Sequence, residues 1–63
     1  MTPEEHLTRA EKLIASEARA AQQKADDADM AGDYVAMRSA EAARVAYMTA
    51  LAHISRARKE AEQ

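Results

Sequence analysis

The stretch Ala31-Gly32-Asp33-Tyr34 decides how this chain of 63 residues folds. Gly32 is the only glycine and lies at the midpoint, between two long segments whose single proline is Pro3. Glycine suits the left-handed residue that follows a helix, and aspartate is a preferred cap for the helix that comes next. One break of this kind predicts two helices joined by a tight turn.

The segment before Gly32 opens with a helix start signal. We expect Thr2 to cap the first free amides, Pro3 to take the first helical position, and Glu5 to complete a capping box. The predicted fold is all-α, a single antiparallel helical hairpin. Its elements are a first helix over 3–31, a turn around 32–33 and a second helix over 34–61, in one domain spanning 1–63.

Each predicted helix carries a stripe of apolar residues, mostly alanine, at steps of three or four. Such steps keep side chains on one helical face. If the chain reverses at Gly32, Ile14 faces Ala50 and Ala18 faces Tyr47, so large residues meet small ones. The stripe of the second helix is Ala36, Ala40, Ala43, Tyr47, Ala50, Ile54, Ala57 and Ala61. The predicted hairpin core is Leu7, Ile14, Ala18, Ala21, Ala43, Tyr47 and Ile54.

Apolar residues beside these stripes predict a second packing surface. Seventeen residues are alanine and there is no Phe or Trp, so one hairpin buries little apolar surface. We therefore expect a homo-oligomer, most simply a homodimeric four-helix bundle. The predicted interface is Leu13, Met37, Arg44, Met48 and Leu51.

Some residues of this surface have a second interpretation. Met37 and Met48 suit either the core of an oligomer or an adaptable recognition groove for another protein. Arg44 suits either a snorkelling surface position or a salt bridge to a carboxylate such as Glu41.

The sequence has no pattern typical of catalysis, metal binding or a cofactor. It lacks cysteine, and neither His6 nor His53 has a second metal-type ligand one turn further on. No serine has a neighbouring base that would activate it. The chain opens without the features of a signal peptide, and the uncharged stretch Val45–Ile54 is too short to cross a bilayer. We predict a cytoplasmic protein that is no enzyme, takes no cofactor and contacts no membrane.

Charge is distributed unevenly along the chain. Residues 1–31 contain four Lys or Arg and seven Asp or Glu, whereas residues 32–63 contain five and four. The acidic excess includes Asp26, Asp27 and Asp29, which lie where a helix dipole disfavours negative charge. These residues form either a solvated surface or a patch for a basic partner.

Basic residues near the C-terminus are candidate phosphate contacts. They are Arg56, Arg58 and Lys59, close to His53. The net charge of −2 and the lack of interleaved aromatic residues argue against nucleic acid as the partner.

Three features resemble known helical proteins. Gly32-Asp33-Tyr34 resembles the turn within a tetratricopeptide repeat, but Met37 stands where that repeat has alanine, and no second copy follows. In length and layout the chain resembles the Rop family of plasmid regulators, which implies a hairpin homodimer. The alanine-rich composition and the opening Thr-Pro-Glu-Glu-His-Leu resemble small helical proteins of uncertain function from actinobacteria and their phages.

Three functional hypotheses result. The preferred one is a non-enzymatic protein-interaction module, a self-associating hairpin that also presents a surface to another protein. The alternative is a small dimeric nucleic-acid-binding regulator that uses the basic end of the second helix. A further possibility is an antitoxin-like or inhibitory peptide whose apolar face occupies a partner's groove.

Overall fold

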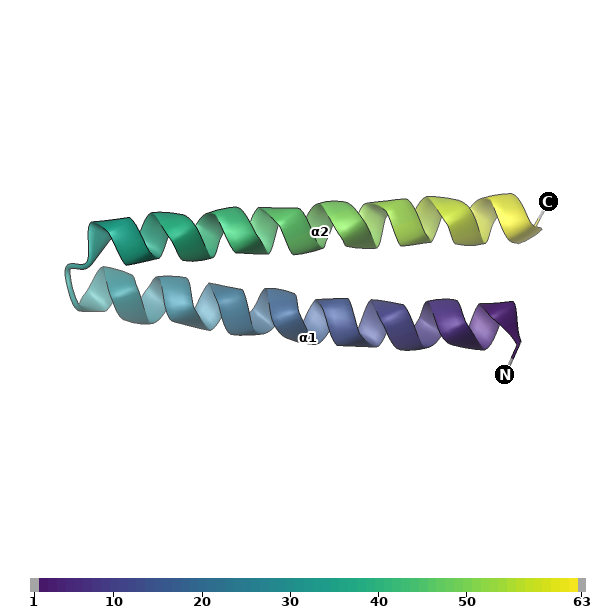
Figure 1. Ribbon diagram of the computed structural model, residues 1–63, viewed down its shortest axis with the longest axis horizontal. Coiled ribbons are helices and arrows are strands. Elements are labelled where there is room, and N and C mark those ends of the chain that lie inside the picture. Colours follow the sequence, from purple (N-terminus) through teal and green to yellow (C-terminus); the bar gives the residue numbers. More distant parts are fainter. Residues whose placement is uncertain (1, 63) are drawn as a thin grey trace.

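The computed structural model describes residues 2–62, which form two antiparallel helices joined by a short turn (Figure 1). Helix α1 spans Pro3–Met30 and helix α2 spans Tyr34–Glu62. The two chain ends lie at one end of the hairpin and the turn lies at the other. The predicted all-α helical hairpin is confirmed. Its Cα atoms extend over 47 × 18 × 10 Å, so the structure is a single layer of helices.

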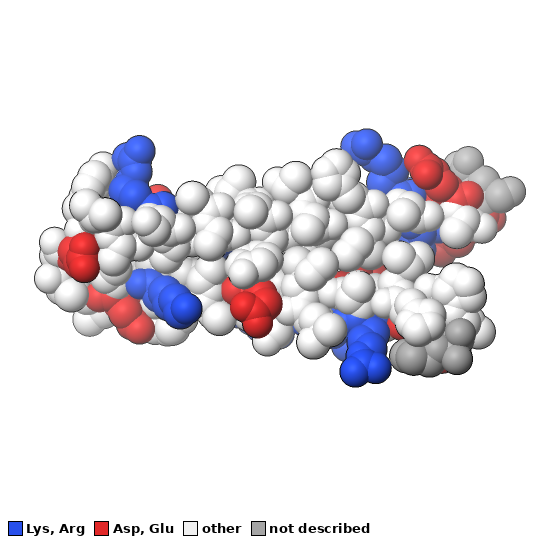
Figure 2. All heavy atoms as spheres, in the orientation of Figure 1, with Lys and Arg blue, Asp and Glu red and all other residues white. Residues whose placement is uncertain are grey.

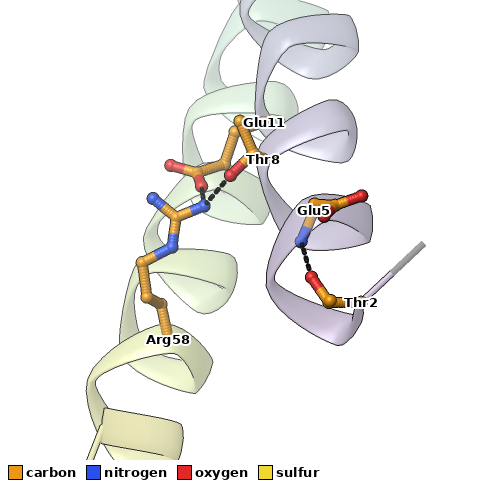
Figure 3. A network of polar contacts seen from close by, with 5 residues as sticks. All are labelled: Thr2, Glu5, Thr8, Glu11 and Arg58. Atoms are coloured by element: carbon orange, nitrogen blue, oxygen red, sulfur yellow. Dashed lines mark hydrogen bonds and ion pairs between the residues drawn. The ribbon is translucent and has the colours of Figure 1, made fainter.

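Helix α1 begins with a side-chain cap. The Thr2 hydroxyl oxygen accepts a hydrogen bond of 3.1 Å from the backbone N–H of Glu5, and Pro3 is the first helical residue (Figure 3). Glu4 and Glu5 lie in the first turn, where their negative charge interacts favourably with the helix dipole. The start of α1 is therefore determined by residues 2–5 alone.

Gly32 closes α1 in a Schellman motif. Its φ of +75° places it in the left-handed region. The N–H of Asp33 donates to the carbonyl oxygen of Ala28 at 2.8 Å, and the N–H of Gly32 donates to that of Asp29 at 3.1 Å. These bonds satisfy two of the carbonyl groups that the end of a helix leaves free.

Asp33 then caps the N-terminal end of α2. Its Oδ1 accepts a hydrogen bond from the N–H of Ala36 at 3.1 Å, and its carbonyl oxygen accepts one from Met37 at 3.0 Å. The chain thus reverses within residues 31–33. Helix α1 ends one residue before the predicted position because Ala31 is its C-cap, and α2 continues one residue further, to Glu62.

Small residues line the closest contact between the helices. Among residues 2–62 the buried ones are Ala18, Ala21 and Ala25, which are 7%, 5% and 2% exposed. Alanine side chains are short, so the backbones approach closely along this part of α1. None of the residues of α2, Tyr34–Glu62, is buried. Within the described chain the hairpin alone removes no large apolar side chain fully from water.

The seam of α2 differs from the predicted stripe. Ala36, Ala57 and Ala61 are exposed, whereas their neighbours Met37 and Arg58 are half-buried. Long side chains reach the seam with their apolar stems where alanine is too short to do so. Five of the eight residues of the predicted stripe are half-buried: Ala40, Ala43, Tyr47, Ala50 and Ile54. The other half-buried residues of α2 are Met37, Arg44, Leu51 and Arg58.

The middle of α2 has no Lys, Arg, Asp or Glu. Figure 2 shows a continuous white area there, with Lys, Arg, Asp and Glu gathered near the ends of the hairpin and along α1. In the sequence this area corresponds to the gap between Arg44 and Arg56. Even so, neither α1 nor α2 contains, within residues 2–62, a stretch long and apolar enough to cross a bilayer.

Candidate interaction surfaces

One face of the hairpin has a groove between the two helices, which we call the Met48 groove. Its volume is about 280 Å³. Met48 is 50% exposed, and Arg44 and Leu51 are more deeply buried than Met48. Because Met48 is the central residue of α2, the groove lies at the middle of the hairpin. The lining residues are Ala15, Ala18, Arg19 and Gln22 of α1 and Arg44, Met48 and Leu51 of α2.

The structure separates the residues predicted to form one oligomer interface. Arg44, Met48 and Leu51 line the Met48 groove together, and Met37 lies one heptad before Arg44 on the same flank. Leu13, which is 61% exposed, does not line this groove. It precedes Glu17 by one turn on the other flank of α1. The structure thus places Leu13 on the opposite face of the hairpin from the Met48 groove, and the interface itself stays a prediction.

That opposite face has a smaller hollow of about 80 Å³. Ala21 and Ala43, both residues of the predicted hairpin core, line it. Glu17 and Lys24 lie at its edge, so a partner docking there must cover or pair two charged groups. The remaining lining residues are Ala20, Ala40 and Tyr47.

The larger residues of the predicted core are only partly covered. Ala18 and Ala21 are buried, but the others are half-buried: Leu7, Ile14, Ala43, Tyr47 and Ile54. Each of the large side chains leaves apolar surface in water, at a cost of roughly 25 cal/mol per Å². The contact between the helices is thus open along both of its edges.

Arg58 connects the two helices near their open end (Figure 3). Its Nη2 forms an ion pair with the carboxylate of Glu11 and donates a hydrogen bond of 2.9 Å to the hydroxyl of Thr8. The side chains of Arg58 and Glu11 are 30% and 28% exposed. Glu11 was not predicted to lie at the seam because it is charged. The available signal was its spacing of seven residues from Ala18, a residue of the seam.

This pairing changes the predicted phosphate contacts. Arg58 is engaged within the hairpin, whereas Arg56 and Lys59 are exposed. Glu60 and Glu62 follow directly and reduce the local positive charge. The three cations therefore do not present one common basic surface.

Arg44 shares one feature with Arg58. Both residues are half-buried, and the Nε of each is shielded from water without an acceptor in the described part of the chain. A shielded N–H that lacks an acceptor costs on the order of 1–3 kcal/mol.

The described residues include no group of three His, Asp, Glu or Cys placed to hold a metal ion. The lining of the Met48 groove combines apolar side chains with Arg19, Gln22 and Arg44. No family model, curated protein or solved structure matches the chain.

Proposed function

We propose that the chain is a non-enzymatic protein-interaction module whose first partner is a second copy of itself. The observation that carries this proposal is the incomplete burial of the hairpin, in which only three small alanines are buried among residues 2–62. Leu13, Val45 and Met48 are half or more exposed. Covering such side chains is the main favourable term in protein association.

The amount of exposed surface supports the same proposal. The hairpin has an accessible surface of 4861 Å². A compact monomer of 6.9 kDa exposes roughly 4,000 Å². The excess of about 850 Å² is close to the roughly 800 Å² that each partner buries in a standard protein interface.

The shape of the hairpin favours a partner stacked on one of its broad faces. Packed helices lie about 8–10 Å apart, and the hairpin is only 10 Å thick. A second hairpin placed on the first makes a cross-section of roughly 18 × 20 Å, which is that of a four-helix bundle. A two-fold dimer is the simplest closed assembly of this kind.

Thermal unfolding across a dilution series tests the proposal. Because dimer formation stabilises the folded chain by mass action, the midpoint measured by circular dichroism is expected to rise with protein concentration over a hundredfold range. A midpoint independent of concentration, in a fully helical protein, contradicts self-association.

A further inference from the structure

We infer that the second copy covers the Met48 groove and lies antiparallel to the first, with the two turns at opposite ends. This inference rests on the proposed self-association and adds the surface and the orientation. Three features carry it: the position of the groove, the state of Arg44 and the distribution of charge along the hairpin.

The Met48 groove is positioned for contact with its own copy. In a two-fold dimer the same patch faces itself across the axis. A groove at the middle of the hairpin allows the two copies to overlap along their whole length. Met48 then packs near its counterpart across the axis, and the shielded Nε of Arg44 lies at an interface that can supply an acceptor. The hollow on the opposite face is smaller. Each face has two charged lining residues, Arg19 and Arg44 at the Met48 groove and Glu17 and Lys24 at the opposite hollow, so the choice rests on the size of the groove and on Met48 and Leu51 within it.

Charge sets the orientation. The turn end, residues 24–41, has two Lys or Arg and five Asp or Glu. The open end, residues 2–12 and 53–62, has five of each. Turns at the same end bring two acidic regions side by side. The antiparallel arrangement separates them by much of the 47 Å length of the hairpin, several times the roughly 8 Å Debye length of physiological salt. It also places each acidic turn beside an end whose positive and negative charges balance.

Spin labels test the orientation directly. The chain has no cysteine, and Met30 beside the turn is 88% exposed, so Met30→Cys introduces one labelling site without disturbing the hairpin. The antiparallel dimer predicts a distance between the two labels on the order of 40 Å or more, because a helix of 28 residues is about 42 Å long. Turns at the same end predict less than about 25 Å, roughly two helix diameters. Glu4→Cys at the other end of α1 provides the second site, with the same expectation.

Two matched substitutions test the surface. Met48→Asp and Leu13→Asp each place a charge on an exposed apolar residue, one in the Met48 groove and one on the opposite face. Met48→Asp is expected to raise the dissociation constant of the dimer at least tenfold, and Leu13→Asp less than threefold, measured by sedimentation. Met48→Lys, with the opposite sign of charge, must act as Met48→Asp does if burial is the cause.

The outcomes separate this inference from the proposed function. A dimer with short label distances, or one dissociated by Leu13→Asp and not by Met48→Asp, overturns the inference and leaves self-association standing. A wild-type chain that stays monomeric overturns both.

Discussion

At the scale of single residues, the hairpin depends on side chains whose roles are local. Gly32 supplies a φ of +75°, which costs an L-residue with a side chain roughly 1–2 kcal/mol. Arg58 combines an ion pair and a hydrogen bond across the two helices. Each of these roles is open to a substitution with a close control.

Gly32→Ala is expected to lower the free energy of unfolding by about 1 kcal/mol. A Cβ added at Gly32 meets no atom within 4 Å, so the loss comes from the left-handed backbone and not from a clash. Gly32→Asn is expected to lose less, since asparagine adopts this conformation more easily. Urea denaturation measures both, and equal losses contradict the explanation.

Arg58→Gln is expected to lower the free energy of unfolding by roughly 1 kcal/mol, because it removes the ion pair with Glu11 and the hydrogen bond to Thr8. Arg56→Gln, at an exposed position, is the control and is expected to change it by less than about 0.5 kcal/mol. A double-mutant cycle of Arg58→Gln with Glu11→Gln must show coupling between the two sites. Additive losses mean that the pair contributes nothing as a pair.

At the scale of the elements, the two helices are defined by their ends and joined along a seam of small residues. Thr2 and Asp33 cap α1 and α2, and Gly32 closes α1. The contact between the helices buries little, since the buried residues of 2–62 are three alanines of α1. The helices therefore depend on their caps and on each other.

Two aspartates four residues apart, Asp29 and Asp33, are expected to differ in their effect on the free energy of unfolding. Asp33→Ala removes the side-chain acceptor at the start of α2 and is expected to cost about 1 kcal/mol of stability. Asp29→Ala removes a negative charge near the C-terminal end of α1, where the dipole disfavours it, and is expected to be neutral or to stabilise by about 0.3 kcal/mol. Thermal denaturation at low salt compares them. Similar losses for both variants would show that capping is not the cause.

The ends of the elements could be predicted from the sequence because capping and turn geometry depend on neighbouring residues, as at Thr2 and Gly32. The seam of α2 was predicted less well. Two of its positions are Arg44 and Arg58, whose charge suggests a solvated surface, and only the placement of Glu11 on the facing helix explains Arg58. The position of Leu13 on the other flank of the hairpin from Met48 could not be predicted, since small changes in where the seam is centred move side chains to another face.

At the scale of the whole molecule, the hairpin is too elongated to be a compact unit of its size. Its radius of gyration is 14.5 Å, against roughly 10.6 Å for a compact chain of this length and about 13.8 Å for one twice as long. The proposed second layer of helices would cover the exposed apolar residues and the open edges of the seam, and it would make the thin hairpin part of a compact assembly.

The molar mass in solution, measured by light scattering across a dilution series, tests self-association most directly. We predict twice the chain mass of 6.9 kDa at micromolar concentrations and above, with a fall toward 6.9 kDa and a loss of helix content on dilution. A mass of 6.9 kDa at every concentration, in a protein that stays fully helical and unfolds cooperatively, contradicts the account.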